Sequence, residues 1–322
     1  MKRTTLFVGL IVIVIILLVG GRFYFSDSDF GIDNPFWNGM DDLSSGLNAH
    51  PLYDISSLAT IDSHDTLLIV SPQTNYTPEE SDMVLKFLNR GGKVVVMDDF
   101  GNADSLLSGI SSPILINPTL LCQYDDYYVN QSFPIIKNFS TSAYFLNVSQ
   151  LTLNYPAALN VSGANVLATS SNKAWLDYND NVKMDPNERV GTYPVIASAD
   201  YNGMGELIVV SDPDIFINSM LDKSDNRVFM SNLLTGVVWV DVSHGRGIAA
   251  LDAFYFVLRD DLLAQLLFIA FILACALAYM NRKAIALYMK KFLTNGWMSN
   301  IQKSIIGFMD AKIPLRGKIL KK

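Results

Sequence analysis

Hydrophobic residues are concentrated in two long runs, one near each end of the chain. Residues 4–21 read TTLFVGLIVIVIILLVGG and residues 262–280 read LLAQLLFIAFILACALAYM, without a charge in either. Each run is long enough to cross a bilayer core of about 30 Å at about 1.5 Å per residue, which predicts two transmembrane helices. The alternatives are a cleaved signal peptide for the first run, which lacks an A-x-A-like site, and a buried soluble helix for the second, which is apolar on every face.

Between these runs, short apolar stretches alternate with helical periods. Residues 66–71 (TLLIVS) and 93–97 (KVVVM) predict buried strands, and residues 77–90 predict a helix with a Thr-Pro-Glu-Glu cap. Strands joined in this way are parallel, with a right-handed crossover. Residues 205–210 (GELIVV) and about 227–240 repeat the pattern as a further strand and helix. The chain therefore belongs to the α/β class.

Residues 110–200 differ from their surroundings. Short β-like pieces alternate there with turn residues, and no long helix is visible. We interpret this part as an all-β insertion or as a widened edge of the sheet.

The charges are distributed unevenly about the two runs. Residues 281–322 carry ten Lys and Arg against one acid, whereas residues 23–261 carry 30 Asp and Glu against 11 Lys and Arg. Because cytoplasmic segments are enriched in Lys and Arg, residues 1–3 and 281–322 are predicted to be cytoplasmic, and residues 23–261 extracytoplasmic. The chain is thus predicted to be a two-pass cell-membrane protein. Its tail suits helices on the inner leaflet or a helical extension with a disordered basic end.

The cysteine and sequon content fits an exported domain. Cys275 lies in the second apolar run, so Cys122 has no disulfide partner in the domain. An acidic, disulfide-free domain is typical of a prokaryotic cell envelope, including that of archaea, and argues against nucleic-acid binding. Five N-x-[ST] sequons lie in the domain as candidate glycosylation sites, at Asn75, Asn130, Asn138, Asn147 and Asn160.

Polar residues follow the predicted parallel strands. The carboxyl ends of such strands share one edge of the sheet, where α/β proteins bind ligands. The candidates for a ligand cleft are Ser71, Asp98, Asp99, Ser211, Asp212 and Asp214. The alternative is that these residues are helix caps and turn formers.

The segment LDYNDNVKMDPNER matches the ligand spacing of an EF-hand calcium loop, with ligands at positions 1, 3, 5, 7, 9 and 12. The positions correspond to Asp177, Asn179, Asn181, the Lys183 carbonyl, Asp185 and Glu188. Position 6, where the sharp turn needs glycine, is Val182. We expect a weak Ca²⁺ site, with a dissociation constant of about 10⁻⁴ to 10⁻³ M. The alternatives are an Asx-rich hairpin loop and a partner-binding loop.

Three longer segments carry a family resemblance: HDTLLIVSPQTNYTPEESDMVLKFLNRGGKVVVMDDFGNADSLL, GELIVVSDPDIFINSMLDKSDNRVFMSNLL and WVDVSHGRG. They resemble the membrane-anchored family defined by the domain of unknown function numbered 4350, over most of residues 35–245. The resemblance implies a flavodoxin-like, doubly wound parallel sheet similar to class I glutamine amidotransferases. Family members are often encoded beside MoxR-type ATPases and other membrane proteins, which implies partners of that kind and a role in envelope assembly.

Amidotransferase chemistry needs a cysteine on a strand-to-helix elbow, with a histidine and an acid nearby. Cys122 has no flanking glycine, and His50, His64 and His244 form no recognisable set with it. The sequence therefore predicts a non-catalytic domain that binds or assembles envelope components together with other membrane proteins. The alternatives are an enzyme that processes envelope glycans or peptides through the carboxylates at the sheet edge, and a purely structural anchor.

Overall fold

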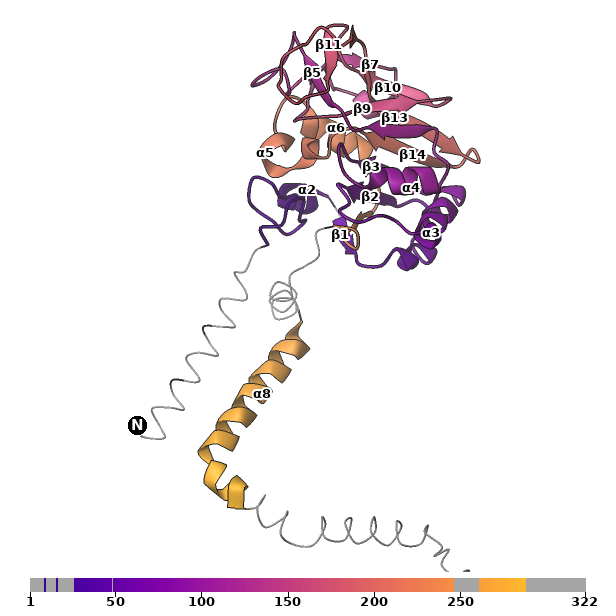
Figure 1. Cartoon of the computed structure of the whole chain (residues 1–322). Coiled ribbons are helices and arrows are strands. Elements are labelled where there is room, and N and C mark those ends of the chain that lie inside the picture. Colours follow the sequence, from indigo (N-terminus) through magenta and orange to yellow (C-terminus); the bar gives the residue numbers. More distant parts are fainter. Residues whose placement is uncertain (1–8, 10–15, 17–25, 48, 246–260, 288–322) are drawn as a thin grey trace, which may run out of the picture. The chain divides into compact units, whose positions relative to one another are not determined.

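An eight-stranded mixed sheet forms the centre of the fold (Figure 1). The computed structural model describes residues 9, 16, 26–47, 49–245 and 261–287. These residues belong to two units, a domain within residues 25–249 and a second unit that contains the C-terminal apolar helix.

Five neighbouring strands of the sheet pair in parallel with one another. The remaining three strands are added to this set by antiparallel pairs. In order across the sheet, the strands are β1 (Ala49–Leu52), β15 (Val238–Asp241), β2 (Thr66–Val70), β3 (Lys93–Met97), β14 (Gly205–Val210), β13 (Pro194–Tyr201), β10 (Asn165–Thr169) and β7 (Asn138–Phe139). The parallel set runs from β1 to β14. The prediction of parallel strands is confirmed for that set, but the sheet as a whole is mixed.

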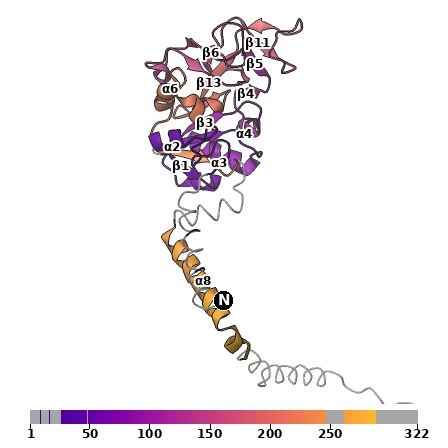
Figure 2. The same ribbon diagram turned by 90° about the vertical axis from the view of Figure 1, so that its left-hand side faces the viewer.

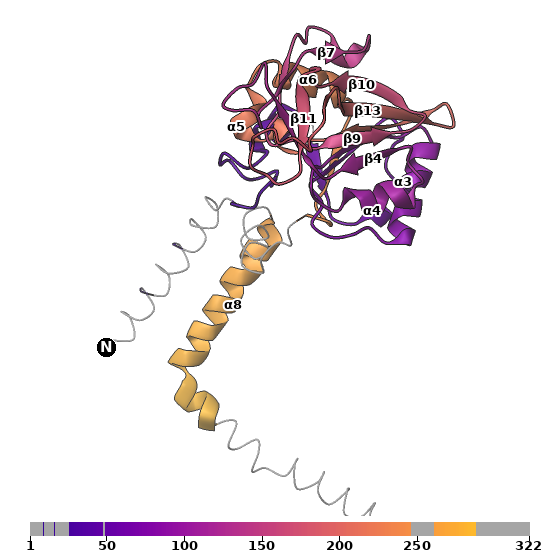
Figure 3. The ribbon, with the colours of Figure 1, turned by 45° about the horizontal axis from the view of Figure 1, so that its top comes forward.

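Both faces of the parallel strands are buried. Alternate side chains of β2, β3 and β14 enter two separate cores, because successive residues of a strand point to opposite faces. One core contains Phe229 and Leu233, and the other contains Val84 and Phe87. This explains why these strands read as unbroken apolar runs. The helices are α2 (Asp41–Gly46), η1 (Ile55–Ala59), α3 (Pro78–Asn89), α4 (Ala103–Gly109), η3 (Asp214–Phe216), α5 (Asn218–Leu221) and α6 (Asn226–Leu233) (Figures 1 and 3).

The predicted cap of α3 is present. The Thr77 hydroxyl accepts a hydrogen bond from the backbone N–H of Glu80 at 3.2 Å, and the Glu80 carboxylate accepts one from the backbone N–H of Thr77 at 2.8 Å. This capping box begins the helix that joins β2 to β3.

The single helix predicted over 227–240 is wrong. Helix α6 ends at Leu233, and Val238–Asp241 form strand β15 beside β2. Gly236 lies between them at a φ of 72°, and a Cβ there would come within 2.8 Å of the His64 carbonyl oxygen. The apolar residues after this turn are mostly β-branched or aromatic, which favours a strand.

Residues 110–200 contain strands β4 to β13, so both interpretations of this segment are correct. Strands β7, β10 and β13 widen the sheet at one edge. The other strands form three small antiparallel sheets, seen in the upper part of Figure 2, and η2 (Ala143–Phe145) lies between them in sequence. These sheets are β12 (Val190–Gly191) with β11 (Ala174–Asp177) and β5 (Leu120–Gln123), β4 (Ile114–Asn117) with β9 (Ala158–Val161), and β6 (Ile135–Ile136) with β8 (Leu151–Thr152).

The second unit contains α8 (Leu262–Met280), whose first turn is capped by the Asp261 side chain. The window Leu262–Tyr279 has a mean hydropathy of 2.5 and is long and apolar enough to cross a membrane. It is the only such helix among the residues that the structure describes. The first predicted span, residues 4–21, lies outside the described residues except for Gly9 and Ile16, and so does most of the tail at 281–322.

Candidate functional site

The carboxyl ends of the parallel strands bring the predicted cleft residues to one edge of the sheet. Val70 and Val210 both pair with Met97, so β2, β3 and β14 end in register. Ser71, Asp98 and Ser211 therefore follow these three strands at the same level, as the β–α–β pattern predicts. Asp99 directly follows Asp98, Asp212 directly follows Ser211, and Asp214 lies two residues further on.

The pKa values of the four aspartates at this edge are all raised, and neighbouring carboxylates contribute to each shift. Burial, together with the charges of Asp98 and Asp214, raises the pKa of Asp99 from 3.8 to about 7. Burial and the charge of Asp29 raise the pKa of Asp214 from 3.8 to about 6. The pKa of Asp212 is also raised, by complete burial and by its charged neighbours. These shifts follow from carboxylates sharing a poorly solvated site.

Two of these aspartates have structural roles. Asp98 accepts hydrogen bonds from the backbone N–H groups of Gly101 at 3.2 Å and Ala103 at 2.9 Å, at the start of α4. Asp212 accepts hydrogen bonds from the backbone N–H groups of Asn154 at 2.7 Å and Asp214 at 2.8 Å. These contacts are those of caps and turn formers, as in the alternative interpretation of this edge.

The two serines differ from each other. Ser71 has a φ of 41°, and its backbone carbonyl accepts a hydrogen bond from the side chain of Gln73 at 2.9 Å. Ser211 is fully buried, and its hydroxyl has no hydrogen-bond partner among the described residues. Neither serine has a hydrogen bond to a histidine within the described residues.

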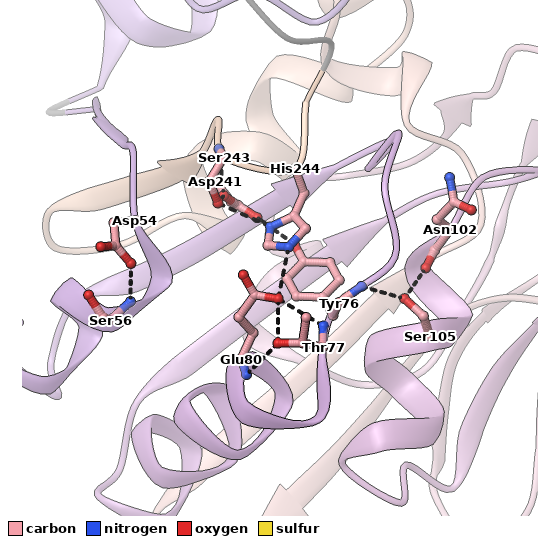
Figure 4. Close-up of polar contacts among 10 residues, drawn as sticks. All are labelled: Asp54, Ser56, Tyr76, Thr77, Glu80, Asn102, Ser105, Asp241, Ser243 and His244. Carbon is pink, nitrogen blue, oxygen red and sulfur yellow. Dashed lines mark hydrogen bonds and ion pairs between the residues drawn. The ribbon is translucent and has the colours of Figure 1, made fainter. Parts of the chain in front are cut away.

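A second polar cluster occupies the same edge, beyond the end of β15 (Figure 4). Nδ1 of His244 lies 2.8 Å from Asp241, and Nε2 of His244 lies 3.4 Å from Glu80. The Tyr76 hydroxyl donates to Asp241 at 2.5 Å, and the Tyr76 ring stacks on the imidazole with centroids 3.7 Å apart. Ser243 donates its backbone N–H and its hydroxyl to Asp241 at 2.9 and 2.6 Å. This cluster was not predicted from the sequence, although the spacing D-x-S-H directly after an apolar strand is a signal for it.

The contacts of this second cluster favour a protonated His244, ionised Asp241 and Glu80, and a neutral Tyr76. Burial would lower the pKa of His244, but the hydrogen bond and charge of Asp241 and the charge of Glu80 raise it above 6.5. Burial would raise the pKa of Asp241, yet hydrogen bonds from His244, Ser243 and Tyr76 hold it below 3.8. Burial likewise opposes the low pKa of Glu80, which its bonds from Thr77 and the charge of His244 hold below 4.5. Burial and the charge of Asp241 keep the pKa of Tyr76 well above 10.

The loop of residues 177–188 is held together by hydrogen bonds among its own residues. Asp177 and Glu188 are 1% and 4% exposed, and their hydrogen-bond donors are backbone N–H groups of the loop. The amides of Asn179 and Asn181 both reach Asp185, at 2.8 and 3.0 Å. Positions 3, 5 and 9 thus converge, but the same contacts also satisfy the Asx-rich hairpin interpretation. Within the described residues, no three acidic, histidine or cysteine side chains are grouped to hold a metal ion.

Residues 32–234 match the family described as a domain of unknown function (DUF4350). The chain belongs to the DUF4350 family. The N-terminal domain of mmIFT52 is similar over 57% of this chain and 82% of that chain, with 19% identity and a TM-score of 0.45. A β-galactosidase from Rahnella sp. R3 is similar over 52% of this chain and 21% of that chain, with 13% identity and a TM-score of 0.32. No curated protein matches.

The cysteine of this DUF4350 domain lies in a small antiparallel sheet. Cys122 lies in β5, between two other strand residues, and is fully buried. Burial and the nearby charges of Asp177, Glu188 and Asp180 raise the pKa of its thiol to about 12. A thiol with so high a pKa is protonated at neutral pH and is a poor nucleophile.

The predicted sequons of this DUF4350 domain are mostly accessible. Asn75, Asn138, Asn147 and Asn160 are exposed, and Asn130 is half-buried. Two of the five amide side chains make hydrogen bonds with other residues of the domain. Asn138 donates to the Ser170 carbonyl at 2.9 Å, and Asn130 accepts from the Ser132 hydroxyl at 2.6 Å.

Proposed function

We propose that this chain is a membrane-anchored, non-catalytic binding and assembly domain of the cell envelope that works with other membrane proteins. In this proposal, residues 23–261 are an extracytoplasmic amidotransferase-like domain of flavodoxin-like type. It lies between membrane helices at 4–21 and 262–280, and both termini are cytoplasmic. The observation that carries the non-catalytic part is Cys122, because the domain's cysteine is buried in an antiparallel strand and stays protonated.

Further support comes from how the strand-end carboxylates are used. Asp98 and Asp212 are buried and occupied by backbone N–H groups of the loops that follow β3 and β14. Carboxylates that accept hydrogen bonds from backbone N–H groups hold a loop in place, and they are not free to exchange protons with a substrate. The apolar length of α8 supports the membrane anchor.

Site-specific photo-crosslinking in the native membrane tests the proposal. A photoreactive amino acid would replace Trp37, Tyr53 or Met204, which are all strongly exposed, and buried Phe87 would serve as the matched control position. We expect the exposed positions to capture other membrane proteins, of the MoxR-neighbourhood type, identified by mass spectrometry. Recovery of no membrane protein from any exposed position would contradict the assembly role.

The second candidate is an enzyme that processes an envelope glycan or peptide. It is favoured by the pKa values of Asp99 and Asp214, about 7 and about 6, which suit a general acid and base near neutral pH. Incubation of the purified domain with envelope glycan and peptide fragments tests it, with Asp99→Asn and Asp82→Asn as paired variants. Turnover that is lost in Asp99→Asn and kept in Asp82→Asn would establish the enzyme, and no turnover by the unmodified protein would reject it.

A further inference from the structure

The segment that follows β15 is fixed to the domain by main-chain hydrogen bonds at two points. The backbone N–H of Val242 donates to the Leu52 carbonyl at 3.0 Å, and the backbone N–H of Gln73 donates to the His244 carbonyl at 2.6 Å. In sequence, this segment is the last described part of the domain before α8. These two bonds hold the backbone of residues 242–244 against β1 and the segment after β2.

His244 is placed so that each of its ring nitrogens faces a carboxylate, Asp241 at Nδ1 and Glu80 at Nε2 (Figure 4). A protonated imidazole has two N–H donors, whereas a neutral imidazole has one donor and one lone pair. Only the protonated ring can donate to both carboxylates. In the neutral ring, one nitrogen lone pair must face a carboxylate, which is repulsive.

The charged groups that act on this cluster come from several elements and are all acidic. Asp241 ends β15, Glu80 lies in the first turn of α3, and Asp98, which follows β3, acts on the Tyr76 ring stacked against His244. Tyr76 itself stays neutral and donates to Asp241. His244 is thus the only described group in the cluster that can supply positive charge.

We propose that Asp241, His244 and Glu80 form a proton-dependent clasp, which holds residues 242–245 on the domain while His244 is protonated and releases them when His244 loses its proton. Release would free residues 242–245 from the domain, which is at most about 14 Å of extended chain. The clasp is a regulatory device that makes the attachment of residues 242–245 to the domain depend on pH.

The direction of the pH effect follows from the raised pKa of His244. A group whose pKa is higher in the closed state than in the open state stabilises the closed state fully below the open-state value, here 6.5. That stabilisation is lost as the pH rises through the higher closed-state value. The lowered pKa values of Asp241 and Glu80 act at the acidic end, where protonation of these carboxylates also weakens the clasp. The clasp is therefore most stable in mildly acidic solution.

Hydrogen exchange of the full chain in lipid nanodiscs tests the proposal between pH 5.5 and pH 8.5. The readout is the exchange of the Gln73 and Val242 amides, corrected for the intrinsic pH dependence of exchange and compared with amides of β3. We expect corrected exchange of these two amides to accelerate with pH, by about tenfold for each unit by which clasp closure raises the pKa of His244. The β3 amides should not change.

Three variants complete the test. His244→Gln, which cannot become positively charged, should show fast exchange at both pH values. Glu80→Gln should shift the transition to lower pH, and this result stands even if His244→Gln fails to fold. His64→Gln is the matched control, because His64 is exposed and its imidazole pairs with Asp62 at 2.8 Å. The transition of this variant should equal that of the unmodified protein. Equal corrected exchange at both pH values, or a transition that His244→Gln or Glu80→Gln leaves in place, would overturn the proposal.

Discussion

Val182 donates its backbone N–H to Oδ2 of Asp177 over 2.6 Å, and it does so at a φ of 56°. This is a left-handed conformation at position 6 of the loop, where the sharp turn of an EF-hand usually has glycine. A β-branched residue is strained there, by about 1–2 kcal/mol. The packing of the Val182 side chain against buried Leu120, Cys122 and Trp175 offsets that strain.

Replacing Val182 with Asn should stabilise the domain, because Asn tolerates the left-handed conformation. The gain is reduced by the loss of two half-buried methyl groups, which leaves about 0.5–1 kcal/mol. We expect a melting temperature higher by about 2–3 °C in calorimetry. Val190→Asn is the control, since Val190 lies in a strand and not among the residues with positive φ. A lower melting temperature for Val182→Asn would show that the packing outweighs the strain.

The same loop carries the Ca²⁺ prediction, which stays a prediction. If Ca²⁺ binds with a dissociation constant of about 5 × 10⁻⁴ M, 5 mM Ca²⁺ should stabilise the domain by about 1.4 kcal/mol relative to EDTA. Glu188→Gln keeps the size of the side chain and removes the predicted bidentate ligand, so its melting temperature should be the same in Ca²⁺ and EDTA. An unchanged melting temperature of the unmodified protein in 5 mM Ca²⁺ rejects the site in favour of the Asx-rich hairpin.

Local signals made much of the fold predictable. The capping box of Thr77 and Glu80 lies within four residues, and the strands around it are continuous apolar runs, so the β–α–β unit could be read from the sequence. The break between α6 and β15 could not, because apolar residues continue across Gly236 and fit either period. The partnership of Glu80 with His244 joins residues distant in sequence, and no local pattern reports such a contact.

The candidate site shows the same division. Placement of Ser71, Asp98 and Ser211 at one edge follows from parallel strands alone, and it was predicted. Whether a carboxylate at that edge caps a loop or titrates near neutral pH depends on burial and on neighbours such as Asn154 and Asp29, which come from other segments. The sequence therefore located this edge without assigning the role of each aspartate.

Asp98 should contribute strongly to stability through its contacts with the start of α4. Asp98→Ala leaves the backbone N–H groups of Gly101 and Ala103 without their acceptor in a buried site, which should cost about 2–4 kcal/mol. Asp98→Asn keeps one acceptor oxygen and should cost about half as much. Chemical denaturation of the two variants measures the difference. A cost below about 1 kcal/mol for Asp98→Ala would contradict the capping role.

Asp99 should lower the stability of the domain as the pH rises. Its pKa is about 7 in the fold against an ordinary value of 3.8, so between these values the folded state binds more protons than the unfolded state. Stability therefore falls from about pH 4 to pH 7, and the full cost is present above pH 7. Asp99→Asn removes the titrating group, so at pH 8 it should be more stable than the unmodified protein. The gain should be about 1–2 kcal/mol, after allowance for solvent at a half-buried side chain.

At pH 4 the same Asp99→Asn variant should differ little from the unmodified protein, because folded Asp99 is then protonated. Asp225→Asn is the matched control of opposite sign. Hydrogen bonds from Ser149 lower the pKa of Asp225, so its contribution to stability is present above pH 3.8 and is lost as the pH falls. At pH 8, Asp225→Asn should therefore be less stable than the unmodified protein, while Asp99→Asn is more stable. Urea denaturation at both pH values gives these differences, and loss of stability in Asp99→Asn at pH 8 would show that the Asp99 carboxylate is instead stabilised in its charged form.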